Sequence, residues 1–199
     1  MQSSPMRCLV VYCHPVPESF GAALRDTAVA ALSDRGFEVR LVDLYAEGFD
    51  PVLGAEERRN MDRAPTDPAL APHIENVRWA EAVLFVYPTW WYGLPAMLKG
   101  WLDRVWATDV AFKLPPDGGR IVSLVSHIKK IGVVTTCGAS PWISFLMGQP
   151  GRKTILRGLR ALCAPTARTL YVAHYDMDRS TPESRAAFLG KVKKRLAAF

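Results

Sequence analysis

The sequence predicts a doubly wound α/β fold, in which a five-stranded parallel sheet carries helices on both faces. Five short segments have the apolar or alternating composition of strands, at residues 8–12, 38–43, 82–87, 131–136 and 168–173. Segments with helical spacing of apolar residues separate them, and this alternation of strand and helix is typical of a parallel sheet. The chain has 199 residues, which suits a single domain spanning residues 1–199.

The first strand, residues 8–12, is a short apolar run rich in residues that favour β-structure. A loop with two prolines follows, and Ser19 then provides the N-cap of a helix that has one apolar face. Gly36 is placed to end that helix. Residues 38–43 alternate between polar and apolar side chains, which predicts a half-buried strand at an edge of the sheet.

Residues 45–72 form a weakly patterned excursion that several prolines interrupt. A short helix over about residues 55–63 is consistent with its charge pattern. Connections of this length in a compact domain are often functional or meet a partner subunit. A short helix at residues 73–79 then leads into the apolar run 82–87, which predicts a fully buried strand.

Three consecutive aromatic residues, Trp90, Trp91 and Tyr92, follow that buried strand. Pro95 then opens an amphipathic helix that runs through Trp106, whose charged residues we expect at the helix surface or at an interface, among them Asp103 and Arg104. The aromatic residues either cover an edge of the core or line a ligand site. Three large rings in a row favour the ligand site, because large apolar rings are costly to expose without a partner.

The second half of the chain repeats the alternation. A turn-rich stretch precedes the strand at 131–136, which ends in a loop over residues 137–142. The remaining predicted elements are a helix over about residues 152–162, the strand 168–173 and a last helix from Thr181 to near Ala198. Right-handed crossovers and five strands favour the order 2-1-3-4-5, with a ligand crevice at the switch point between the first and third strands.

Three unusual loops follow strand ends, at residues 14–20, 88–93 and 136–142. The order 2-1-3-4-5 makes their strands neighbours, so we expect the loops to meet in one crevice. The helix at Ser19 offers unpaired N–H groups to a phosphate, the aromatic loop offers ring faces, and residues 135–139 offer hydroxyl and N–H groups. The sequence has no G-x-G-x-x-G or Walker A motif. These features predict a flat, aromatic, phosphorylated ligand.

Composition narrows the function classes. The net charge is +6, and the basic residues are spread along the chain, so we expect no nucleic-acid partner. No apolar run approaches the ~20 residues of a membrane helix, and the N-terminal residues do not resemble a signal peptide, which favours a cytoplasmic protein without membrane insertion. Cys8, Cys13, Cys137 and Cys163 form no C-x-x-C pair, so neither a metal site nor a disulfide framework is expected.

Residues 14–20, 88–101 and 135–139 together resemble the flavodoxin-like NAD(P)H:quinone oxidoreductases. These include the DT-diaphorase type, the bacterial modulator-of-drug-activity proteins and the potassium-efflux ancillary flavoproteins. The resemblance runs from the first strand to the last helix. It implies an FAD cofactor, with FMN as the alternative, and NAD(P)H as co-substrate. It further implies ping-pong, two-electron hydride transfer to quinones, and a homodimer with the active site at its interface.

The resemblance also implies roles by position. His14, Ser19 and Phe20 would hold the cofactor phosphates, and Arg185 aligns with an arginine that reaches the adenosine end of FAD. The isoalloxazine would lie along Pro88, Thr89, Trp90, Trp91 and Tyr92, with its polar edge on Thr135, Thr136, Cys137 and Gly138. Phe112 takes the place of an aromatic residue that the other subunit contributes. The candidates for the substrate pocket are Trp91, Phe112 and Trp142.

Two departures from the family pattern bear on activity. The DT-diaphorase type carries a Tyr and a His that are linked to proton delivery, and residues 142–149 contain neither. Cys137 replaces the first glycine of the family's Gly-Gly pair. An alternative function is therefore a flavin-binding regulatory subunit that docks on a membrane transporter. A one-electron carrier is a weaker alternative, since such carriers are usually acidic and this chain is basic.

Overall fold

A computed structural model describes residues 4–115 and 117–199, and it contains the predicted parallel sheet. The five strands lie in the order β2-β1-β3-β6-β7, which is the predicted order 2-1-3-4-5. Their bounds are Arg7–Tyr12 (β1), Glu38–Asp43 (β2), Ala82–Thr89 (β3), Lys130–Cys137 (β6) and Arg168–His174 (β7). The predicted flavodoxin-like α/β fold is therefore confirmed.

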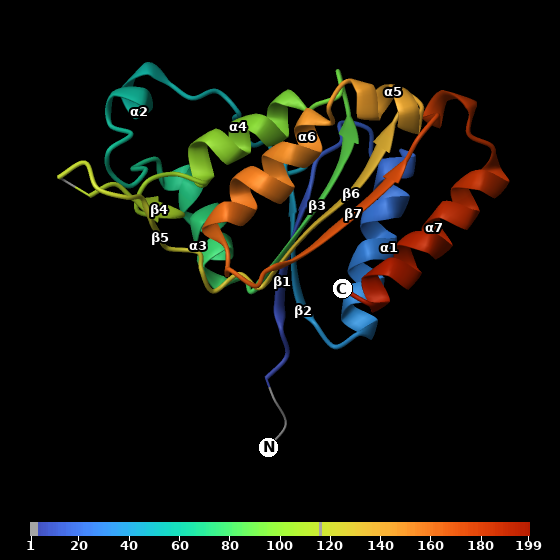
Figure 1. The fold of residues 1–199 in the computed structure, drawn as a ribbon, viewed down its shortest axis with the longest axis horizontal. Coiled ribbons are helices and arrows are strands. Elements are labelled where there is room, and N and C mark those ends of the chain that lie inside the picture. The colour runs from blue at the N-terminus through green and yellow to red at the C-terminus, as the bar shows by residue number, and fades with distance from the viewer. Residues whose placement is uncertain (1–3, 116) are drawn as a thin grey trace.

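The sheet register places the functional loops at one edge. All four strand pairings in this sheet are parallel, so the carboxyl ends of the strands point the same way (Figure 1). Pro88 and Thr89 of β3 are level with Thr136 and Cys137 of β6. The loops that leave β1, β3 and β6 therefore begin close together.

Helices cover both faces of the sheet (Figure 1). One face packs against α1 (Phe20–Asp34) and α7 (Pro182–Ala197). The other face packs against α3 (Ala71–Trp79), α4 (Ala96–Val105) and a segment that starts as α6 (Pro150–Lys153). That segment continues through a π-helical turn, Thr154–Gly158, and a 3-10 turn, Leu159–Leu162. Each face has its own apolar core, and the fully buried Trp101 of α4 packs edge-on against Phe85 of β3.

The predicted helix boundaries have clear local causes. The Ser19 hydroxyl accepts a hydrogen bond from the Ala22 N–H at 3.2 Å and so caps α1. After this helix the chain turns at Gly36, whose φ is +84°, in the left-handed region that glycine adopts without strain. Thr181 caps α7, where its hydroxyl accepts from the Ser184 N–H at 3.2 Å.

Three short elements were not predicted. Residues 141–146 form a short helix, α5 (Pro141–Leu146), in which the Ser140 hydroxyl accepts from the Ile143 N–H at 3.3 Å. The predicted loop over residues 137–142 was therefore wrong at residues 141 and 142, because Ser140 and Pro141 together are a helix start signal. In addition, β4 (Phe112–Lys113) and β5 (Val122–Ser123) form an antiparallel pair, and such short strands leave no alternating pattern in the sequence.

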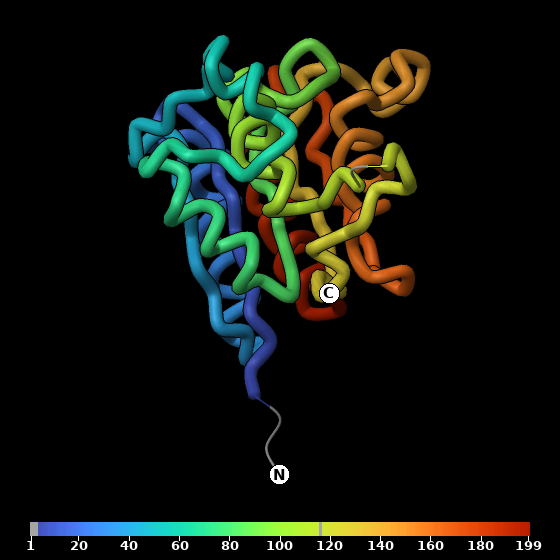
Figure 2. The backbone as a smooth tube through the Cα atoms, turned by 90° about the vertical axis from the view of Figure 1, so that its left-hand side faces the viewer, coloured from blue at the N-terminus to red at the C-terminus, as the bar shows by residue number. Residues whose placement is uncertain are grey.

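The excursion after β2 folds back over α4. It contains α2 (Ala55–Arg59), shorter than the expected 55–63, and a 3-10 turn at Pro68–Leu70 that leads into α3. Figure 2, which views this side of the molecule, shows the excursion in cyan and blue-green in front of the sheet. Among the described residues, no helix combines the length and the apolar character that crossing a membrane requires.

Candidate functional site

The carboxyl ends of β1, β3 and β6 open into one cleft of about 990 Å³. Small-molecule and cofactor sites measure roughly 300–1,000 Å³, so this cleft is large enough for an extended ligand. All three loops singled out in the sequence contribute to it. The predicted site residues that line it are His14, Ser19, Phe20, Pro88, Thr89, Trp90, Trp91, Tyr92, Thr136, Cys137 and Gly138.

One end of the cleft is the N-terminus of α1. Within the described part of the chain, the backbone N–H groups of Phe20 and Gly21 donate to no acceptor. A methyl group at Gly21 would lie 3.2 Å from both the His14 ring and the Ser19 hydroxyl, so a side chain here would crowd the capping residues. Unpaired N–H groups and the positive end of the helix dipole make this end of the cleft suitable for an anion.

His14 adds a further donor at this end. Its Nδ1 accepts a hydrogen bond from the Val16 N–H at 3.0 Å. Burial lowers the pKa of His14 below its usual value, which favours the neutral imidazole at neutral pH. In the neutral ring only one nitrogen carries hydrogen, so the proton is on Nε2. Because His14 lines the cleft, Nε2–H is available to donate to a ligand there.

The aromatic wall is a strained turn. Trp91 and Tyr92 have φ values of +49° and +61°, and the Gly93 N–H donates to the Trp90 carbonyl at 2.9 Å to close the turn. A bulky residue in the left-handed region costs of order 1–3 kcal/mol, so the surrounding structure must hold this turn in place. Trp91 is 95% exposed and Trp90 is 42% exposed. The turn therefore presents apolar rings at the cleft rather than in the core.

Polar side chains of β3 and β6 pair with one another where these strands reach the cleft. The Thr89 and Thr135 hydroxyls lie 2.8 Å apart, and the Thr135 hydroxyl is also placed to donate to the Thr136 carbonyl at 3.2 Å. Thr135 is fully buried and does not line the cleft, although the sequence grouped it with the site. The Cys137 sulfur lies 3.5 Å from the Ser144 hydroxyl of α5.

Three other candidates lie outside this cleft. Arg185 is on the first turns of α7, where its Nε donates to the Ser180 hydroxyl at 2.8 Å. Phe112 lies in the β4–β5 pair and packs against the core on the α4 face. Trp142 is in α5 and is 69% exposed, next to the cleft residue Ile143.

Sequence reasoning missed Met177 and Asp178, which line the cleft from the loop after β7. The Asp176 N–H of this loop donates to the Ala139 carbonyl at 3.2 Å, which ties it to the loop after β6. Asp178 approaches Gly138 so closely that a methyl group there would lie 2.8 Å from its Oδ2. A signal was available, because β7 neighbours β6 and its following loop must reach the same edge of the sheet.

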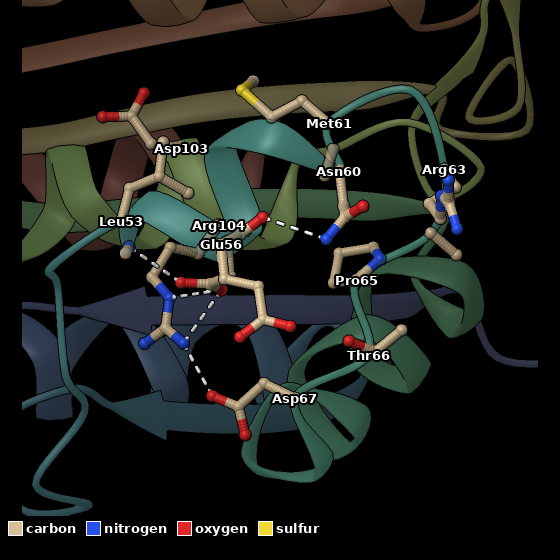
Figure 3. Close-up of a pocket in the computed structure, with 14 residues that line it drawn as sticks. Leu53, Glu56, Asn60, Met61, Arg63, Pro65, Thr66, Asp67, Asp103 and Arg104 are labelled. Atoms are coloured by element: carbon tan, nitrogen blue, oxygen red, sulfur yellow. Dashed lines mark hydrogen bonds and ion pairs between the residues drawn. The ribbon is translucent and has the colours of Figure 1, made fainter.

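A second hollow, of about 370 Å³, lies between α4 and the excursion (Figure 3). Arg104, which the sequence placed at the helix surface or an interface, is buried here and is only 6% exposed. Its guanidinium donates to Glu57 at 3.0 Å and to Asp67 at 2.6 Å. Since these carboxylates already satisfy the buried cation, we assign this cluster to structure, in which it fastens the excursion to the helix.

Comparisons with known proteins agree with this architecture. A family model described as having a flavodoxin-like fold matches residues 6–196. NAD(P)H dehydrogenase [quinone] 1 of Cavia porcellus is 30% identical over 96% of this chain and 76% of its own length. Ribosyldihydronicotinamide dehydrogenase [quinone] of Mus musculus is 34% identical, but the match covers 55% of this chain and about half, 54%, of the mouse protein.

Among solved structures, that of Smu.1420 from Streptococcus mutans superposes with a TM-score of 0.83 and is 28% identical, covering 98% of this chain and all of its own. The family match, the full-length relative and this superposition all span nearly the whole chain. The chain therefore belongs to the flavodoxin-like family of NAD(P)H:quinone oxidoreductases.

Proposed function

We propose that this chain is a flavin-dependent NAD(P)H oxidoreductase that reduces quinones or similar small acceptors by two-electron, ping-pong hydride transfer. The observation that carries the proposal is the single cleft in which an anion-binding helix terminus faces an aromatic turn. Family membership and the quinone dehydrogenase relatives support it. Neither relative named above is a transporter subunit by name, so the oxidoreductase is preferred over the transporter-docking alternative.

The residues of the cleft fit a flavin. The free N–H groups of Phe20 and Gly21, with Ser19 and His14, would hold its phosphate. The rings of Trp90, Trp91 and Tyr92 would lie along the isoalloxazine, and residues 136–139 would meet its polar edge. When bound, the flavin supplies the hydride-accepting and hydride-donating ring, which no side chain can provide.

The protein's own part is binding, orientation and exclusion of water. The exposed ring of Trp91 is placed to cover a small planar substrate at the mouth of the cleft. Backbone N–H groups at Gly138 and Ala139 are positioned to stabilise negative charge at the ligand's polar edge. Because the aromatic turn is closed by its own hydrogen bond, from the Gly93 N–H to the Trp90 carbonyl, its rings would be held in place before the ligand arrives.

FAD is the cofactor that we favour over FMN. The cleft extends past Phe20 to Met177 and Asp178, toward the start of α7 where Arg185 lies. This extension gives an adenosine a place beyond the phosphate-binding helix. Mass spectrometry of the cofactor released from the purified protein tests the choice, and recovery of FMN alone would overturn it.

The function is tested on the purified protein loaded with flavin. Its visible absorbance should bleach when NAD(P)H is added without oxygen and return when 1,4-naphthoquinone is added. A protein that stays colourless after incubation with FAD and with FMN would rule the proposal out. A protein that binds flavin but shows no quinone turnover would favour the regulatory-subunit alternative.

Replacing Ser19 with alanine should weaken flavin binding by roughly tenfold, since a hydrogen bond to a charged group contributes about 1.5–3 kcal/mol. Loss of the helix cap should also lower the free energy of unfolding by about 1 kcal/mol. Thr181→Ala is the matched control, because it removes the cap of α7 at a residue that does not line the cleft. The control should lose similar stability and bind FMN, which has no adenosine to reach α7, as the wild type does, as followed by fluorescence titration of both variants with FMN. Equal flavin affinity in the two variants would remove Ser19 from the phosphate site.

We also propose that the protein forms a homodimer through α5. Trp142 and Phe145 are each 69% exposed, and their rings stack at 6.3 Å with an interplanar angle of 26°. Leu146 extends the same patch at 63% exposure, and apolar patches of this kind usually mark an interaction surface. Phe145→Glu should therefore convert a dimer into a monomer in analytical ultracentrifugation. A wild-type protein that sediments as a monomer at all concentrations would contradict the proposal.

A further inference from the structure

A small polar cavity lies directly beneath the cleft. It measures about 10 Å³, about the smallest volume that admits one water molecule. Thr89, Tyr92 and Cys137 form the wall that it shares with the cleft. Its opposite wall includes Gln149, Arg152 and Tyr175, which come from the loop after α5, from α6 and from the loop after β7. In Figure 1, α5 and the start of α6 lie beside the carboxyl ends of β6 and β7.

The hydrogen bonds behind this cavity have a defined direction. Arg152 Nη1 donates to Gln149 Oε1 at 2.8 Å, and Gln149 Nε2 donates to the Tyr175 hydroxyl at 3.2 Å. A guanidinium has no acceptor, so it fixes the amide oxygen of Gln149 on its own side and the amide nitrogen on the side of Tyr175. The Tyr175 oxygen is therefore an acceptor in this bond, and its own hydrogen remains free to donate elsewhere.

Neighbouring groups hold this arrangement. Gln149 has a φ of +48°, a left-handed conformation that an ordinary residue adopts only when its surroundings impose it. The Arg152 guanidinium also lies 4.9 Å from the centre of the Tyr171 ring. Burial raises the pKa of Tyr171, and the adjacent Tyr175 hydroxyl adds to the shift, so Tyr171 stays protonated. Tyr175 lines both this cavity and an open recess beside α7, which Tyr171 does not line, so Tyr175 is the tyrosine of the pair that connects the cavity with solvent.

Thr89, on the wall that the cavity shares with the cleft, offers a hydrogen-bond acceptor. Thr135 gives its hydroxyl hydrogen to the Thr136 carbonyl at 3.2 Å, so Thr89 is the donor in the pair of threonine hydroxyls. The lone pairs of the Thr89 oxygen remain available on the side of the cavity. A group of the size of water between the two walls would thus accept from Tyr175 and donate toward the cleft side.

Tyr175 also has access to solvent. It lines an open recess of about 340 Å³ on the α7 side, and Gln149 and Arg152 line another hollow of about 400 Å³. The hydroxyl can therefore lose a proton toward the cavity and regain one from bulk water.

We propose that Tyr175, oriented by Gln149 and Arg152, supplies the proton that quinone reduction requires. The inference rests on the proposed function. NAD(P)H gives up a hydride, and the quinone gains that hydride and one proton to become a hydroquinone. The proton passes from the Tyr175 hydroxyl to the group in the cavity, and from there past Tyr92 and Cys137 to the quinone oxygen in the cleft. Bulk water restores the proton of Tyr175. This role belongs to residues in the loops after β7 and α5, and not to a Tyr and His pair within residues 142–149.

Two substitutions test the role in different ways. Tyr175→Phe removes the proton, whereas Gln149→Glu keeps the shape of the side chain but makes it an acceptor that draws the tyrosine hydrogen away from the cavity. Each should slow 1,4-naphthoquinone turnover by roughly 100-fold, the low end of general acid catalysis, and should abolish the solvent deuterium isotope effect. Tyr45→Phe, a matched change outside the cavity and the cleft, should leave the rate unchanged.

Two further measurements separate a proton-supply role from a structural one. The flavin dissociation constant should stay within twofold in all three variants. In the wild-type protein without flavin, the Raman difference spectrum against Tyr175→Phe should show a tyrosine hydroxyl that accepts a hydrogen bond as well as donating one, and Gln149→Glu should show one that only donates. Full turnover in either Tyr175→Phe or Gln149→Glu would overturn the proposal, as would a wild-type tyrosine hydroxyl that accepts no hydrogen bond. Normal Raman spectra with no wild-type quinone turnover would instead locate the failure in the proposed function.

Discussion

Replacing Arg104 with methionine should lower the free energy of unfolding by about 3 kcal/mol, the low end of the range for breaking a buried ion pair. Arg104 is 6% exposed, and it donates to the Asp50 carbonyl at 2.6 Å as well as to Glu57 and Asp67. Methionine fills part of the volume but leaves all three acceptors without their donor. For a chain of this size the melting temperature should fall by roughly 6–12 °C.

Lys99→Met is the matched control for this prediction. Lys99 lies on the same helix and pairs with Asp103 at 2.6 Å, but its side chain is 54% exposed. An exposed pair of this kind contributes about 0.3–0.5 kcal/mol, so the control should melt close to the wild type. Thermal denaturation of both variants without flavin provides the comparison. If the two lose the same stability, the cluster around Arg104 does not fasten the excursion.

Arg104 also shows where sequence reasoning stops. Its charge and helical position predicted a surface or interface residue, which is correct for Asp103, whose side chain is 43% exposed, but wrong for Arg104. The carboxylates that bury it are 37 and 47 residues away in the chain. Local patterns carry no information about such distant partners, because the excursion that supplies them has no periodicity of its own.

The strands and the first helix were predictable for the opposite reason. The apolar run of β3 and the cap at Ser19 are local signals, and the parallel order then brings three distant loops to one edge of the sheet. The polar cavity was not predictable in this way. Tyr175 and Gln149 come from separate loops, and their hydrogen bond depends on the left-handed backbone at Gln149, which no sequence rule assigns to glutamine.

The close contact of the excursion with α4 leads to a second prediction. A methyl group at Gly100 would lie 2.2 Å from the Pro51 carbonyl oxygen and 2.6 Å from its Cα. These are backbone atoms, so they cannot move aside as the end of a long side chain would. Gly100→Ala should therefore destabilise the protein by about 3 kcal/mol, the upper end for overpacking, although alanine favours a helix.

Gly190→Ala is the same glycine-to-alanine change, but it should stabilise the protein. Gly190 lies inside α7, and a methyl group there would meet no atom of the described residues within 4 Å. Helix propensity alone should then raise the free energy of unfolding by about 0.8–1 kcal/mol. Urea denaturation of both variants should show shifts of opposite sign. A stabilised Gly100→Ala protein would mean that Pro51 does not press on α4.

The two variants should also differ in flavin binding. Helix α4 starts at Ala96, just after the strained turn that carries Trp91 and Tyr92. Displacing α4 from Pro51 must move this turn or release its strain, and either change alters the aromatic wall of the cleft. Gly100→Ala should consequently weaken flavin affinity even where the variant remains folded, whereas Gly190→Ala should bind flavin as the wild type does. Equal affinities would show that the aromatic turn is held by its own hydrogen bond and not by the packing of α4.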